Sequence, residues 1–199
     1  MGCRMGRKRS IDRGAVLDAA ERVVARDGAA RLTLDAVASE AGISKASVLY
    51  DYKSKPALIA ALVERSVAAD NAFNQAKIES LGPVDNATIR GRILAAEAPL
   101  PDAFRAVALN LCAALAQDAE LRRTIQANQQ AVIADITASS ANPRGALLAY
   151  LALEGLKLLE SLDYHSWPRA ERDAILADIA WLVDAEPGAG PPLPAPPQD

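Results

Sequence analysis

The most informative stretch of the sequence runs from Thr33 to Tyr52 and reads TLDAVASEAGISKASVLYDY. Thr33 and Ser44 each precede a short predicted helix, because a hydroxyl side chain at that position can cap the free backbone amides. Gly42 lies between the two helices, where a tight turn requires a residue that tolerates positive φ. Two short helices joined by such a turn predict a helix-turn-helix motif.

The second helix of this motif presents short polar side chains on its predicted outer face. Ser44, Lys45, Ser47 and Tyr50 could reach base edges and phosphates if the helix lay in a major groove. The alternative for the motif as a whole is an ordinary helical corner. The alternative for Tyr50 and Tyr52 is packing between the third and fourth helices.

The rest of the chain also predicts helices. Hydrophobic residues make up 51% of the 199 residues and aromatic residues only 4%, with alanine and leucine throughout. This composition favours helix packing over sheets, so we expect an all-α fold. Hydrophobic spacing, caps and prolines predict helices over residues 12–27, 33–41, 44–50, 54–80, 85–97, 101–117, 119–138, 143–162 and 168–184.

The net charge of −3 is unevenly distributed along the chain. Residues 1–65 contain twelve Lys or Arg and eight Asp or Glu, a net charge of +4, whereas the remaining residues have a net charge of −7. A basic N-terminal part followed by an acidic part suggests that only the first part meets phosphate.

Several function classes are not expected. The two cysteines and one histidine are too few for a disulfide framework or a zinc site. No apolar stretch reaches the roughly 18–20 residues that span a bilayer, and no secretory signal is apparent. No Gly-rich phosphate loop or nucleophile–base pair is seen either. We therefore expect a cytoplasmic protein that is not an enzyme and has no cofactor or metal.

The motif from Gly42 to Lys45, followed by Leu49 to Lys55 and Leu58, resembles the tetracycline-repressor (TetR) family of bacterial transcriptional regulators. The resemblance covers Ile11 to about Val63. It implies that Thr33 and Lys55 contact phosphates, and that recognition-helix positions read bases; these positions are Lys45, Ala46, Ser47 and Leu49. The sequence departs from the family at Leu49, where many members have a phosphate-contacting tyrosine, so Tyr50 or Tyr52 is expected to supply that contact.

Four parts of the chain are expected from these patterns. Residues 1–10 form a basic arm, in which Arg7, Lys8 and Arg9 reach DNA or remain solvated. Residues 11–55 form a three-helix helix-turn-helix domain, and the resemblance implies that residues 56–186 bind an effector and dimerise. Residues 187–199 contain six of the twelve prolines and are expected to be a disordered tail.

The resemblance implies a regulator, in our interpretation a repressor, that a small-molecule effector releases from a palindromic DNA operator. The alternative is a ligand-free architectural or protein-interaction protein that uses the same motif. Polar or aromatic residues within apolar helices are candidate effector ligands, unless they are exposed or already paired. They are Phe73, Phe104, Asn110, Gln126, Gln129 and Glu154.

The stretch 143–162 is apolar nearly all round, so its own chain can cover only one of its sides. We therefore expect a two-fold homodimer that uses the last two helices. The predicted interface consists of Gly145, Ala149, Ala152, Gly155, Ile175, Ile179, Leu182 and Val183. Leucines 148, 151, 158 and 159 then fill the monomer core, although the two faces could be exchanged.

Overall fold

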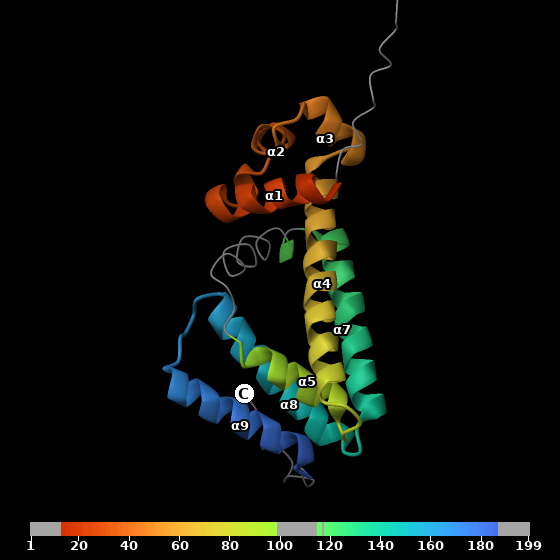
Figure 1. The fold of residues 1–199 in the computed structure, drawn as a ribbon, viewed down its shortest axis with the longest axis vertical. Helices are drawn as coiled ribbons and strands as arrows, with labels where there is room; N and C mark the ends of the chain where they lie inside the picture. The colour runs from red at the N-terminus through yellow and green to blue at the C-terminus, as the bar shows by residue number, and fades with distance from the viewer. Residues whose placement is uncertain (1–12, 99–114, 117, 187–199) are drawn as a thin grey trace, which may run out of the picture. The chain divides into compact units, whose positions relative to one another are not determined.

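The computed structural model describes residues 13–98, 115–116 and 118–186. The helices are α1 (Arg13–Asp27), η1 (Ala29–Arg31), α2 (Leu34–Ala41), α3 (Lys45–Asp51), α4 (Lys55–Ser80), α5 (Ala87–Ala96), α7 (Ala119–Ser139), α8 (Pro143–Ser161) and α9 (Arg169–Asp184). Figure 1 shows their course along the chain. No strand occurs in the described residues, and the all-α prediction is confirmed.

The described α-helices begin and end within two residues of the predicted positions. The short 3-10 helix η1 was not predicted, and most of the predicted helix over 101–117 lies outside the described residues. Among the described helices, none combines the length and apolar character required to cross a membrane.

The described residues form two compact units: the first contains 13–70, 115–116 and 118–128, and the second contains 71–98 and 129–186. The core of the first unit is built from α1, α2, α3 and the first turns of α4, with η1 and Leu121 of α7. Val23, Leu32, Val37 and Val48 are fully buried there. One buried residue from each short helix therefore fixes the helix-turn-helix to α1.

The first unit extends further along α4 than the predicted boundary at residue 55. Leu58 and Leu62 are fully buried in the same core as α1 and α2, because they lie one helical turn apart on one face of α4. Helix α4 continues past residue 70, so its last turns belong to the second unit.

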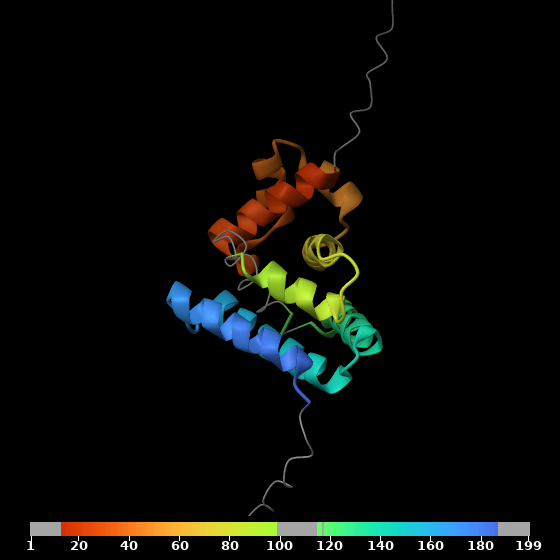
Figure 2. The ribbon, with the colours of Figure 1, turned by 60° about the horizontal axis from the view of Figure 1, so that its bottom comes forward.

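The second unit contains α5, α8 and α9, with the ends of α4 and α7. Its core includes Ile89 of α5, Leu153 of α8 and Val183 of α9. Helices α8 and α9 form an antiparallel hairpin, and α5 lies against both of them (Figures 1 and 2).

Helices α4 and α5 approach closely at Gly91. A Cβ atom at this position would lie 2.7 Å from Cα and 2.8 Å from the backbone nitrogen of Ile78, so the backbone itself fills the space. Only a residue without a side chain allows this approach.

Gly91→Ala is therefore expected to destabilise the second unit by about 1–3 kcal/mol, because the backbone of α4 must move to admit the methyl group. The free energy of unfolding, measured by urea denaturation, tests this expectation. Unchanged stability would show that α4 and α5 do not approach as described.

Candidate nucleic-acid interface

The turn between α2 and α3 is fixed by backbone and side-chain hydrogen bonds. Gly42 ends α2 in the left-handed conformation, with φ of 65°. The amide of Ile43 then donates to the carbonyl oxygen of Ala38 at 3.0 Å, which closes the helix end. Ser44 begins α3, and its hydroxyl oxygen accepts a hydrogen bond from the backbone amide of Ser47 at 3.1 Å.

Thr33 caps α2 in the same way. Its Oγ1 atom accepts a hydrogen bond from the backbone amide of Ala36 at 3.0 Å. Because the oxygen acts as acceptor, the exposed hydroxyl still has a proton to donate. The Thr33 hydroxyl at the start of α2 thus keeps a proton that can be donated outside the chain.

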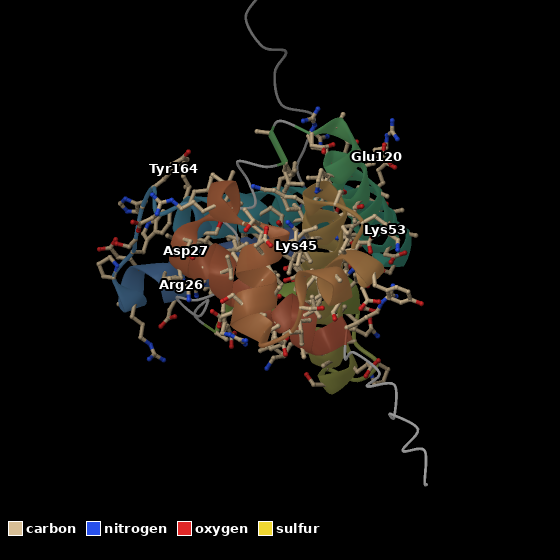
Figure 3. The ribbon with its side chains drawn as sticks, turned by 90° about the horizontal axis from the view of Figure 1, so that it is seen from above. Arg26, Asp27, Lys45, Lys53, Glu120 and Tyr164 are labelled. Carbon is tan, nitrogen blue, oxygen red and sulfur yellow. The ribbon has the colours of Figure 1, made fainter. Side chains whose placement is uncertain are left out.

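Ion pairs connect α1 to α2. Arg22 Nε donates to Glu40 at 2.8 Å, and Arg26 Nη1 donates to the same carboxylate at 3.0 Å. The hydrogen bonds from Arg22 and then Arg26 lower the pKa of Glu40. Arg26 also bonds Asp27, which lowers the pKa of Asp27 and raises that of Arg26 (Figure 3).

Arg65 connects α4 to α1. Its Nη1 lies 2.6 Å from Oδ1 of Asp18, and its Nε donates to Glu21 at 3.0 Å. Burial disfavours the charged guanidinium, but the bonds to Glu21 and Asp18 outweigh that effect and raise the pKa of Arg65. These pairs hold the helices behind α3 in place.

The outer surface of α3 is open. Lys45, Ala46 and Leu49 are exposed, and Tyr50 is 76% exposed. Ser47 is half-buried, and its hydroxyl lies 2.8 Å from that of Ser44, so part of its hydrogen-bonding capacity is already used. Four of the five predicted side chains on α3 therefore face outward.

Lys45 is paired within the chain. Its Nζ donates to Oδ2 of Asp35 on α2 at 2.8 Å, and both side chains are largely exposed. Exposed pairs of this kind are worth little in water, so a nucleic acid can compete for the ammonium group. Asp35 therefore holds Lys45 toward α2 without burying it.

Lys53 was not predicted as a contact residue. Its Nζ lies 5.2 Å from the centre of the Tyr50 ring and donates to the carbonyl of Tyr50 at 2.7 Å. Lys45 and Lys53 are labelled on the face seen in Figure 3. The feature of the sequence that could have drawn attention to Lys53 is its position, next to Tyr52 and close after the predicted recognition helix.

Tyr52 is not part of the open surface. It is 7% exposed and belongs to the core of the first unit, and this burial raises its pKa. The DNA-contact interpretation is therefore corrected for Tyr52, and the packing alternative holds. Lys55 is half-buried and donates to the carbonyl of Ala30 at 2.8 Å, so it also connects α4 to η1.

The structure describes four of the six predicted effector residues. Phe73 and Gln126 are exposed, with Lys77 over the Phe73 ring at 5.6 Å. Gln129 accepts a hydrogen bond from the Tyr150 hydroxyl, and Glu154 pairs with Lys157 at 2.9 Å. These four residues are thus exposed or paired. Phe104 and Asn110 lie outside the described residues, as do Arg7, Lys8 and Arg9 of the predicted arm.

In the structure, the small-residue face of α8 packs within its own chain and the leucine face is exposed, which is the reverse of the predicted arrangement. Gly145 and Ala149 are buried, because a Cβ at Gly145 would lie 2.7 Å from the carbonyl oxygen of Leu182 on α9. Ile179 and Val183 are buried in the same core, while Ala152, Gly155, Ile175 and Leu182 are half-buried. Small residues admit the neighbouring helix of the same chain, and the leucines face outward.

The described residues offer no metal centre, since no three His, Cys, Asp or Glu side chains in these ranges lie close enough together to hold an ion. What the first unit offers is an exposed helix with one lysine on it and a second just beyond its end, a hydroxyl at an adjacent helix start, and a rigid support. Such an arrangement suits the major groove and phosphates of a DNA duplex.

Two family models match the chain. The model described as bacterial regulatory proteins, tetR family, matches residues 16–62, and that described as tetracyclin repressor-like, C-terminal domain, matches residues 86–184. No curated protein sequence matches the chain.

Solved structures share the fold. SCO7518 from Streptomyces coelicolor A3(2) has a TM-score of 0.70 at 18% identity, covering 87% of this chain and 98% of that one. The multidrug binding protein EbrR complexed with imidazole has a TM-score of 0.65 at 21% identity, covering 87% and 90%. A Saccharomonospora viridis protein in complex with choline has a TM-score of 0.66 at 16% identity, covering 86% and 94%.

Ser44→Ala is expected to destabilise the first unit by about 0.5–2 kcal/mol, because the N-cap bond to the Ser47 amide is lost. Ser39→Ala is the matched control, since Ser39 is an exposed interior residue of α2. Chemical denaturation measures both variants. Equal effects of the two substitutions would contradict the capping role of Ser44.

Proposed function

The chain belongs to the tetR family of bacterial regulatory proteins, and on that premise we propose that it is a repressor that a small-molecule effector releases from its operator. The observation that supports DNA binding is the exposed outer surface of α3. Lys45, Ala46, Leu49 and Tyr50 lie on it, in front of a helix pair fixed by two caps and several ion pairs.

The residues of this surface have different roles in the proposal. Lys45 reads a base once it leaves Asp35, and the methyl group of Ala46 meets a thymine methyl or allows close approach. Thr33, Tyr50 and Lys53 contact phosphates on either side of the groove. Phosphate contacts set the position of the protein on the duplex, and base contacts select its sequence.

The proposal predicts different outcomes for the two lysines. Lys45→Ala changes the sequence recovered when random duplexes are selected by binding, and costs about 1–3 kcal/mol on the original site. Lys53→Ala instead weakens binding to all sequences about equally and reduces the salt-dependence slope by about 1. Binding is measured by fluorescence anisotropy over a range of salt concentrations.

The selection also tests the orientation of α3. If Lys45→Ala recovers the same sequence as the unmodified chain, α3 does not present Lys45 to the bases. If the chain selects no sequence at all, its proposed role at an operator is wrong.

Dimerisation through α8 and α9 is the second part of the proposal. Leu148, Leu151 and Leu158 lie along one exposed face of α8, and Leu151 is 55% exposed. Trp181 of α9 is 68% exposed. Apolar residues at successive helical turns on neighbouring helices are typical of a face that a second copy covers, and a two-fold dimer would match a palindromic operator.

Leu151→Arg is expected to convert the dimer into a monomer, because a buried unpaired guanidinium is costly at an apolar interface. Gln130→Arg is the matched control, since it places the same charge at an exposed position of α7. Light scattering after size exclusion measures the mass. A monomeric unmodified chain at micromolar concentration, or a dimeric Leu151→Arg variant, would contradict the proposed interface.

Effector release requires that the ligand favour the state that does not bind DNA. A typical coupling of about 1–3 kcal/mol corresponds to 5–150-fold weaker operator binding. Helix α4 is the proposed connection, since its first turns belong to the first unit and its last turns to the second. The bound imidazole and choline of two structural neighbours support small-molecule binding in this fold.

A further inference from the structure

Arg92 of α5 is the one charged residue among the buried residues that the structure describes, with 9% of its surface exposed. Its Nε is shielded from solvent and has no hydrogen-bond partner. The terminal nitrogens Nη1 and Nη2 do not share this combination of full shielding and a missing hydrogen-bond partner. The guanidinium thus lies inside the second unit, and its Nε is shielded without a partner.

The other partly buried arginines in the described ranges all have acceptors within the chain: Arg122 donates to the carbonyl oxygens of Leu115 and Ala116, and the rest pair with carboxylates. Arg172 lies 2.7 Å from Glu160, and Arg65 lies 2.6 Å from Asp18. Arg90, two positions before Arg92, lies 2.6 Å from Asp184. Among the residues of those same ranges, no carboxylate is paired with Arg92. Arg92 is the most buried of these arginines, and its Nε has no acceptor among the described residues.

The residues around Arg92 on its own helix are apolar. Ile89, Ile93 and Ala95 are buried, and Gly91 lies against Ile78 of α4. The nearest acidic residue on α5 or at its end is Glu97, which is exposed, while Asp184 of α9 is engaged by Arg90. Burial removes water from the guanidinium, and no anion in these surroundings replaces that water. The burial of this charge is therefore unfavourable in free energy.

We propose that Arg92 is the recognition residue for the effector, and that the effector is an organic anion with a carboxylate or phosphate on an apolar body. The inference rests on the proposed function, because it names the ligand class of that regulator. A guanidinium binds an oxyanion through parallel N–H donors, and its planar fork gives the site a preference for such groups. The apolar neighbours on α5 would contact the body of the ligand.

The position of Arg92 also links the ligand to α4. Gly91 is its neighbour in sequence and is in close contact with the backbone of Ile78. An anion drawn to Arg92 changes the charge beside this contact, and any shift of α5 must move Ile78 because no space remains between them. The class of ligand differs in charge from choline, the ligand named for one structural neighbour.

The test uses the full chain and two pairs of probes that differ in charge: hexanoate with hexanamide, and benzoate with benzamide. Inorganic phosphate, at the same ionic strength, distinguishes a tetrahedral anion from a carboxylate. Two readouts are followed, the melting temperature and the arginine Nε–Hε resonance of Arg92. We expect a saturable rise of the melting temperature by about 2 °C or more with an anion, and a shift of the Arg92 resonance.

Arg92→Met keeps a long side chain without the charge, and Arg123→Met removes an exposed arginine of α7 as the control. We expect Arg92→Met to abolish the response to anions and to raise the melting temperature of the ligand-free chain. Arg123→Met should retain the full response. A response to phosphate alone would assign the site to phosphorylated ligands.

Three results would overturn the inference: no saturable response to any anion, an equal response to the neutral amides, or a lower ligand-free melting temperature for Arg92→Met. Operator binding without probes is measured on the same samples. Sequence-specific DNA binding without an anion response rejects only the role of Arg92. An anion response without DNA binding rejects the proposed function but retains the anion site.

Discussion

The open surface of α3 depends on the backbone conformation of one residue, Gly42. A Cβ there would meet nothing within 4 Å, so the constraint is its φ of 65° and not the available space. Residues other than glycine rarely adopt this backbone conformation without strain. From this turn Ile43 closes α2, Ser44 caps α3, and Val48 enters the core. Tyr50, two residues further, consequently faces solvent.

Arginines that join two helices are paired with carboxylates in both units. In the first unit Arg22, Arg26 and Arg65 are engaged by carboxylates that join α1 to α2 and α4. Lys45 pairs only with the exposed Asp35, and Lys53 donates to a backbone carbonyl, so these two lysines do not hold α1 in place. In the described part of the second unit, the buried Arg92 has no such carboxylate. A buried cation without a partner points to a negative charge supplied from outside the chain.

The sequence predicted the helix-turn-helix closely, because caps and turns are local and the signals at Thr33, Gly42 and Ser44 act within a few residues. Burial was harder to predict. Periodicity identified α8 as apolar on two sides but not which side meets its own chain, and the close approach at Gly145 decides this. Tyr52 and Arg92 illustrate the same difficulty, since an aromatic ring or a guanidinium is placed by distant helices and not by its neighbours in sequence.

In the proposed function, the surface formed by the start of α2 and the outer side of α3 binds duplex DNA. Amide chemical shifts of the 20.9-kDa chain, followed during titration with a duplex that it has selected, report on this surface residue by residue. We expect the largest shifts on Thr33 to Ala36 and Ser44 to Lys53, with core residues such as Val23 little affected. Shifts confined to α8 and α9, or none at saturating duplex, would contradict the proposed function.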